Sequence, residues 1–121
     1  MSIQNFKDII AWQKAHELTL NVYRLTEKYP KSETFGLVIQ TRRCAVSIPS
    51  NLVEGFKRKH VKDSLHFYNI AQGSLEELRY QLMLAKDLSY ISTEENERAE
   101  SLADEVAKLI YSWIKSHNAK D

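Results

Sequence analysis

The sequence predicts an all-α protein that folds as an antiparallel up-and-down four-helix bundle. The 121 residues include only 3 glycines and 2 prolines, so few positions favour tight turns. Hydrophobic residues recur alternately three and four positions apart along most of the chain, which is typical of amphipathic helices. Because 43% of the residues are hydrophobic, one core can be filled. A chain of this length is typical of one domain, which we expect to span residues 1–121.

The first helix is expected at residues 9–29. Its core positions follow the three-and-four spacing: Ala15, Leu18, Val22, Leu25 and Tyr29. A second group of side chains widens the apolar arc beyond the needs of one partner helix: Trp12, His16, Thr19 and Tyr23. The helix should end before Pro30, because a residue that precedes proline is disfavoured in the helical region.

The second helix, residues 34–56, has two apolar flanks separated by a polar stripe. The stripe consists of Gln40, Arg43, Ser47, Asn51, Glu54 and Arg58. One flank carries Leu37, Cys44, Ala45, Ile48 and Leu52, and the other carries Ile39, Val46 and Val53. A bundle helix normally buries one face, so the second flank predicts contact with another copy of the chain. The expected interface is Gln40, Ile39, Arg43, Val46, Ser47, Asn51, Val53 and Glu54.

Within that interface, Arg43 would pair with Glu54 of a neighbouring helix, and Gln40 and Asn51 would fix the register. The alternative interpretation of the stripe is a solvated helix face.

The third helix is expected at residues 61–88 and the fourth at residues 92–116. The third has its core positions at Tyr68, Ala71, Leu75, Leu78, Leu82 and Ala85. Gly73 lies inside it and weakens the helix, so we expect this glycine to permit a close helix crossing. The fourth begins with a capping box of Ser92 and Glu95, and its core positions are Ala99, Leu102, Val106, Leu109 and Trp113.

Catalytic, metal and membrane motifs are missing from the sequence. There is no Gly-rich phosphate loop, nucleophile elbow or paired metal motif, so we expect no enzyme activity, no metal, no cofactor and no small-molecule substrate. The single cysteine, Cys44, excludes a disulfide framework within the chain and fits a reducing compartment. Without an apolar run of membrane-spanning length or a secretory signal, the expected location is the cytoplasm, with no membrane partner.

The most basic segment lies between the second and third helices. The net charge of +1 gives the whole chain no attraction to nucleic acid, so any basic surface must be local. We expect RNA or DNA to bind Lys57, Arg58, Lys59, His60 and Lys62, with Arg42 and Arg43 as further contacts. Aromatic residues are sparse nearby in the sequence, which favours contact with the phosphate backbone over base stacking. The simpler interpretation is a solubilising turn.

Several motifs resemble one bacterial family. They are Trp12-Gln13-Lys14-Ala15, Tyr29-Pro30, Ser47-Ile48-Pro49-x-Asn51, Glu54-Gly55-Phe56 and Ala71-x-Gly73-Ser74-Leu75. The chain resembles, over residues 6–91, the four-helix-bundle proteins encoded in intervening sequences of 23S rRNA genes, which are ribosomal protein-like. The resemblance implies a ring-like homopentamer without known catalysis and with a link to RNA. Lys57 and His60 stand where the family usually has glycine and serine, which makes the turn more basic and weakens the cap of the third helix.

Two hypotheses for function follow from these observations. The first is a non-enzymatic oligomeric bundle that binds nucleic acid through the basic segment. The alternative is a protein–protein interaction scaffold with no nucleic-acid role.

Overall fold

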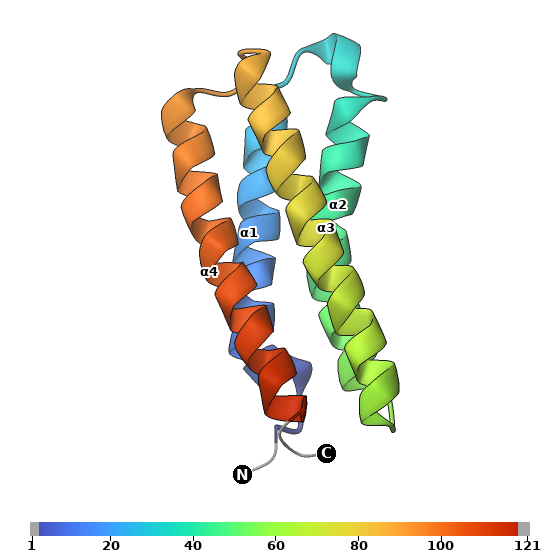
Figure 1. Cartoon of the computed structure of the whole chain (residues 1–121). Helices are drawn as coiled ribbons and strands as arrows, with labels where there is room; N and C mark the ends of the chain where they lie inside the picture. The colour runs from blue at the N-terminus through green and yellow to red at the C-terminus, as the bar shows by residue number, and fades with distance from the viewer. Residues whose placement is uncertain (1–2, 119–121) are drawn as a thin grey trace.

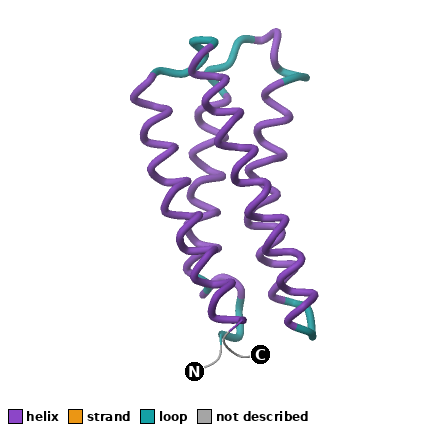
Figure 2. Tube along the Cα trace, in the orientation of Figure 1, coloured by secondary structure: helices purple, strands orange, loops and turns teal. Residues whose placement is uncertain are grey.

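The computed structural model describes residues 3–118, and those residues form helices and turns without any strand (Figure 2). The four long helices are α1 (Ile10–Thr26), α2 (Leu37–Phe56), α3 (Val61–Asp87) and α4 (Thr93–Asn118). Two single 3-10 turns, η1 (Phe6–Asp8) and η2 (Lys31–Glu33), precede α1 and α2. The all-α class and the four-helix bundle are therefore confirmed.

The helices run alternately up and down and lie side by side (Figure 1). α1 and α3 each pack against both α2 and α4. The α1–α2 and α3–α4 connections lie together at one end, which we call the upper end. The α2–α3 turn, the start of α1 and the end of α4 lie at the lower end. None of the described helices is long and apolar enough to cross a membrane.

The first two helices are shorter than the sequence patterns suggested. α1 ends at Thr26 instead of residue 29, and residues 27–29 form a turn in which Tyr29 is buried. α2 begins at Leu37 instead of residue 34, because the chain after Pro30 first makes η2. The Glu33 side chain then accepts a hydrogen bond from the Leu37 backbone N–H (Oε1 to N, 3.1 Å), which satisfies a free donor at the start of α2.

The core follows the predicted positions on α1, α2 and α3. The expected core side chains of these three helices are all buried, including the flank of α2 that carries Leu37 and Leu52. On α4 the prediction is partly wrong: Ala103 and Ile110 are fully buried, whereas Leu102 and Leu109 are half-buried. The buried face of α4 is therefore rotated by about one residue from the expected one.

The close helix approach occurs at Gly55 and not at Gly73. A Cβ at Gly73 would meet nothing within 4 Å, so the expectation of a close crossing there is wrong. A Cβ at Gly55 would overlap the ring of Tyr68 on α3, at 2.4 Å from Cε1 and 3.0 Å from the Ser64 carbonyl oxygen. Gly55 therefore lets the end of α2 lie directly against the start of α3.

Candidate functional site

The α2–α3 connection forms a short exposed turn at the lower end, which we call the basic turn (residues 57–62). At the C-terminal end of α2, the Lys57 N–H donates a hydrogen bond to the Val53 carbonyl (3.3 Å) and the Arg58 N–H donates one to the Gly55 carbonyl (3.2 Å). His60 is the N-cap of α3 and has extended backbone, but its side chain makes no capping hydrogen bond. The structure thus brings the five expected basic residues of this segment together at one end of the bundle.

Arg58 is held by its own chain, whereas the lysines beside it are not. Its Nη2 donates to Glu54 Oε1 (2.8 Å), and its guanidinium carbon lies 4.7 Å from the centre of the Phe67 ring. Lys57, Lys59 and Lys62 are exposed, and no carboxylate among residues 3–118 forms an ion pair with them. The turn therefore presents three ammonium groups that are free to meet an external anion.

The helix dipoles account for only some of the positive residues of the basic turn. Lys57 and Arg58 follow the C-terminal end of α2, where positive side chains are favourable. Lys59 and Lys62 flank the N-terminal end of α3, where positive charge is unfavourable and only Asp63 is acidic in the first turn. The lysines at the start of α3 do not stabilise that helix, so the fold gives no reason for them.

Three of the six acidic residues of α4 pair with cations from other parts of the bundle. Lys28, in the turn after α1, pairs with Glu95, and Lys14 of α1 pairs with Glu105 (Nζ to Oε1, 3.5 Å). Arg79 of α3 donates to Glu100 (Nε to Oε1, 2.7 Å). The acidic segment is therefore tied to the rest of the bundle by ion pairs, in contrast to the basic turn.

Arg42 and Arg43 do not join the basic turn. They lie about 20 Å from it along α2, given a helical rise of about 1.5 Å per residue. The Arg42 Nε donates to Thr26 Oγ1 (2.7 Å), and its guanidinium covers the Tyr23 ring at 4.4 Å. Arg42 thus connects α2 to α1, while Arg43 is exposed.

The polar stripe of α2 is partly satisfied within the chain. Ser47 contacts Ser74 of α3 (Oγ to Oγ, 2.8 Å), and the Asn51 amide donates to the Ser47 carbonyl (2.8 Å). Glu54 forms an ion pair with Arg58 of the same chain. We expected Glu54 to pair instead with Arg43 of a neighbouring copy. Gln40 remains exposed beside the groove between α2 and α3.

The second apolar flank of α2 faces the outer groove between α1 and α2. Val46 is 39% exposed there, and Ile39 and Val53 are half-buried. Tyr23 of α1 lines the same groove and is also 39% exposed. These side chains form an apolar strip that the single chain does not cover.

Cys44 is a core residue. Its Sγ donates to the Ser74 carbonyl at 3.0 Å, and burial, with the Glu77 charge as a smaller cause, raises the pKa of the thiol to about 12. Such a thiol is a poor nucleophile. Among residues 3–118, no group of three or more His, Cys, Asp or Glu side chains is arranged to hold a metal ion.

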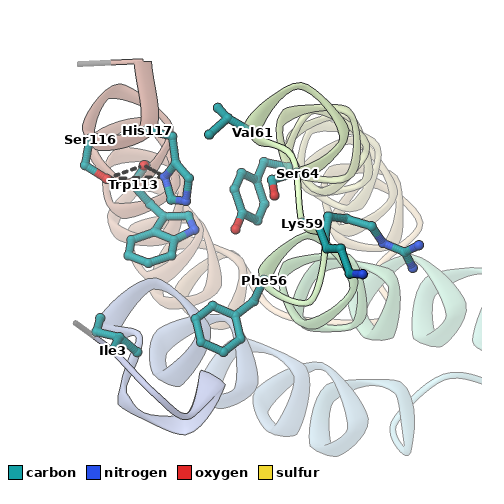
Figure 3. Close-up of a pocket in the computed structure, with 10 residues that line it drawn as sticks. Ile3, Phe56, Lys59, Val61, Ser64, Trp113, Ser116 and His117 are labelled. Atoms are coloured by element: carbon teal, nitrogen blue, oxygen red, sulfur yellow. Dashed lines mark hydrogen bonds between the residues drawn. The ribbon is translucent and has the colours of Figure 1, made fainter. Parts of the chain in front are cut away.

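Aromatic side chains lie beside the basic turn, although the sequence around the turn contains few. Phe56 comes from the end of α2 and Trp113 from the last turns of α4, with His117 one turn later (Figure 3). The spacing of apolar residues predicted only a core position for Trp113. The antiparallel order of the helices could have predicted that Trp113 lies near the basic turn, because it places the end of α4 beside the α2–α3 turn.

Comparison with known proteins gives a family match and a structural match. The model of the 23S rRNA-intervening sequence protein family matches residues 7–112. A crystal structure of a protein with unknown function from the S23 ribosomal protein family of Bacteroides thetaiotaomicron VPI-5482 is similar, with a TM-score of 0.80 and 26% sequence identity. The alignment covers 88% of this chain and 99% of that one. No curated protein matches the chain.

Proposed function

Because the chain belongs to the 23S rRNA-intervening sequence protein family, we propose that it is a non-enzymatic, cytoplasmic, oligomeric helical bundle that binds RNA through the basic turn. The observation that carries this proposal is the set of exposed lysines at the lower end that pair with no carboxylate of residues 3–118. Two of them flank the positive end of α3, where they oppose helix stability. A bound phosphate would neutralise these lysines and interact favourably with the same helix end.

The proposed binding is electrostatic and should depend strongly on salt. Each phosphate that a lysine neutralises releases counterions from the RNA, so affinity falls as salt rises. A single turn offers few contacts. A cyclic oligomer would place one basic turn from every copy on the same face, and the contacts would then add up along one RNA strand.

Self-association is the second part of the proposal, with a homopentamer as the expected state. The uncovered strip of Tyr23, Ile39, Val46 and Val53 supports it, because apolar surface of this kind is stabilised by contact with another copy. Gln40, Arg43, Ser47, Asn51 and Glu54 run beside the strip and would form the polar part of the interface.

The RNA proposal is tested by reversing charge at the basic turn. The variant Lys57→Glu/Arg58→Glu/Lys59→Glu should lose retention of single-stranded RNA in a filter-binding assay at about 50 mM salt, where electrostatic binding is strong. The control is Arg24→Glu/Lys31→Glu/Arg98→Glu, which changes the total charge equally at exposed positions away from the turn. The control should retain RNA. Unchanged retention by the first variant, or equal loss in both, would reject the basic turn as the binding surface.

The self-association proposal is tested by sedimentation at micromolar concentration. Wild-type protein should sediment as five copies of the 14.1 kDa chain. Val46→Glu should dissociate the assembly, because a charge is costly at a dry interface. Met83→Glu is the matched control, since Met83 is a similarly exposed apolar residue (46%) on α3. A wild-type mass of one chain, or equal dissociation by both variants, would contradict the assigned interface.

The scaffold alternative has one observation in its favour. Tyr80 and Met83 are 56% and 46% exposed and lie about one turn apart on α3, so they offer a small apolar surface to a protein partner. A wild-type protein that binds neither RNA nor DNA at low salt would favour this alternative.

A further inference from the structure

A cavity of about 570 Å³ opens at the lower end of the bundle, next to the basic turn. Its walls come from three helices: Phe56 ends α2, Ser64 and Tyr68 belong to α3, and Trp113 and His117 belong to α4 (Figure 3). Lys59 of the basic turn contributes to the rim on the side away from α4. The volume lies within the range of small-ligand sites in proteins.

One wall is a rigid group of aromatic rings. The Trp113 and His117 rings lie 4.6 Å apart, and the Tyr68 ring lies 5.2 Å from His117 and 6.2 Å from Trp113. His117 Nδ1 is 2.8 Å from the Trp113 carbonyl oxygen, and this contact fixes its position. Phe56 faces this group from α2. Such surfaces bind planar rings by stacking and edge contacts.

Two polar groups in this wall have no hydrogen-bond partner among the described residues. They are the hydroxyl of Tyr68, which is completely buried, and the indole N–H of Trp113. Burial raises the pKa of the Tyr68 hydroxyl more than the nearby Trp113 and Ser64 lower it, so the hydroxyl keeps its proton and can both donate and accept. Both atoms are buried, so the wall meets a ligand through the faces and edges of its rings.

The charges around the cavity are positive. Arg58 and Lys59 contribute to the lining, and no carboxylate does so among the described residues. Arg58 is engaged with Glu54 and Phe67, which leaves Lys59 as the cation available to a ligand. The cavity thus combines aromatic walls with an exposed lysine at the rim.

We propose that this cavity binds one nucleotide, with the base against Trp113 and Phe56 and the phosphate at Lys59. A nucleotide supplies a planar base for the aromatic wall and a phosphate for the Lys59 ammonium group. Free nucleotides and nucleotides of an RNA strand share this chemistry. For a nucleotide within a strand, the inference rests on the proposed RNA binding and adds a base contact where the sequence predicted contact with phosphates alone.

The emission of Trp113 reports binding directly. The other tryptophan, Trp12, lies on α1 and stacks against His16, so a Trp12→Phe background leaves Trp113 as the only signal. AMP should change this emission saturably. Ribose 5-phosphate and inorganic phosphate should bind at least about tenfold more weakly, because they lack the stacking base. No saturable change with AMP, or equal binding of ribose 5-phosphate, would overturn the proposal.

Variants separate the base contact from the phosphate contact. In the same background, Lys59→Ala should weaken AMP binding at least about tenfold through loss of a charge-assisted contact. Lys31→Ala is the control, because Lys31 is an exposed lysine at the upper end. His117→Ala should weaken AMP binding and leave binding of inorganic phosphate unchanged. Circular dichroism confirms that each variant is folded, and equal effects of Lys59→Ala and Lys31→Ala would reject the rim assignment.

A short RNA distinguishes this inference from the proposed function. A single-stranded hexanucleotide that displaces AMP would show that the cavity accepts nucleotides of a strand. AMP binding by a protein that retains no RNA would reject the proposed RNA function and support a free-nucleotide site. RNA retention without any AMP response would reject the cavity proposal and leave the basic turn as the RNA surface.

Discussion

At the upper end of the bundle, hydrogen bonds and an ion pair between side chains join the two connections, whereas at the lower end Lys57, Lys59 and Lys62 pair with none of the described carboxylates. The Tyr90 hydroxyl donates to Glu33 Oε2 (2.8 Å), and the other oxygen of Glu33 closes the start of α2. The Glu95 carboxylate forms an ion pair with Lys28 and accepts a hydrogen bond from the Ser92 backbone N–H (2.8 Å). This network fixes the two upper connections.

The lower end contains similar residue types in a different arrangement. Lys57, Lys59 and Lys62 make no ion pairs with the described carboxylates. Buried groups without a partner among the described residues occur at both ends: the Tyr68 hydroxyl and Trp113 N–H below, and the Tyr29 hydroxyl and Thr41 Oγ1 above. At the upper end, charged and aromatic residues stabilise the fold because they meet complementary groups. The three lysines of the basic turn meet no such group among the described residues, which favours an external anion as their partner.

The largest effect expected on stability comes from filling Gly55 at the lower end. Gly55→Ala should lower the free energy of unfolding by about 1–3 kcal/mol, because the new methyl group overlaps the Tyr68 ring. Urea unfolding measures the change. The control is Gly73→Ala, which should raise stability by about 0.5–1 kcal/mol, since its methyl group meets nothing and alanine favours helix. Equal effects of the two variants would show that the Gly55–Tyr68 contact is not tight.

The next largest effect concerns the upper network. Ser92→Ala should cost about 1 kcal/mol, because the Ser92 Oγ accepts the Glu95 N–H (3.0 Å) at the start of α4. Thermal and urea unfolding should both show the loss. Ser50→Ala, at an exposed position inside α2, is the matched control and should change stability little. If Ser92→Ala leaves the free energy of unfolding unchanged, water replaces the capping hydrogen bond without loss of stability.

A smaller effect of opposite sign is expected at the basic turn. Lys62→Glu should raise stability by about 0.3–1 kcal/mol, because an acid at the start of α3 complements the helix dipole. The same variant should weaken RNA binding. Increased stability together with unchanged RNA affinity would mean that Lys62 is not an RNA contact, and decreased stability would refute the dipole argument.

The smallest effect is the pH dependence at Glu95. The Lys28 ammonium, followed by the Ser92 backbone N–H, lowers the pKa of the Glu95 carboxyl below its ordinary value of 4.5. The stability from this group is present above that value and is lost as pH falls through the folded-state pKa. Glu95→Gln should therefore lose less stability than wild type below about pH 4.5, with the difference limited by solvent screening. Identical pH profiles would show that Glu95 contributes no such linkage.

The sequence predicted most of the fold, because local signals were strong. The capping box of Ser92 and Glu95 forms as expected, and the spacing of Leu18, Leu75 and Leu82 identified buried positions correctly. The family match over residues 7–112 confirms the resemblance found in the motifs.

Other features depend on contacts between distant segments, which local patterns do not encode. The role of Gly55 depends on the position of Tyr68 on another helix, and the buried face of α4 depends on its rotation against α1 and α3. The basic turn was visible as a run of charges. The aromatic wall beside it was not, because Trp113 and Lys59 lie far apart in sequence and meet only through the helix order.

The most direct test of the account is the salt dependence of RNA binding by the wild type and by Lys57→Glu/Lys59→Glu/Lys62→Glu. If each turn neutralises three phosphates, the logarithm of affinity per chain should fall with the logarithm of salt concentration at a slope of about −2 for single-stranded RNA. The variant should bind too weakly to measure at about 50 mM salt while keeping the wild-type sedimentation mass. Equal affinity and equal slope for both proteins would contradict the claim that the lower end of the bundle is an RNA-binding surface.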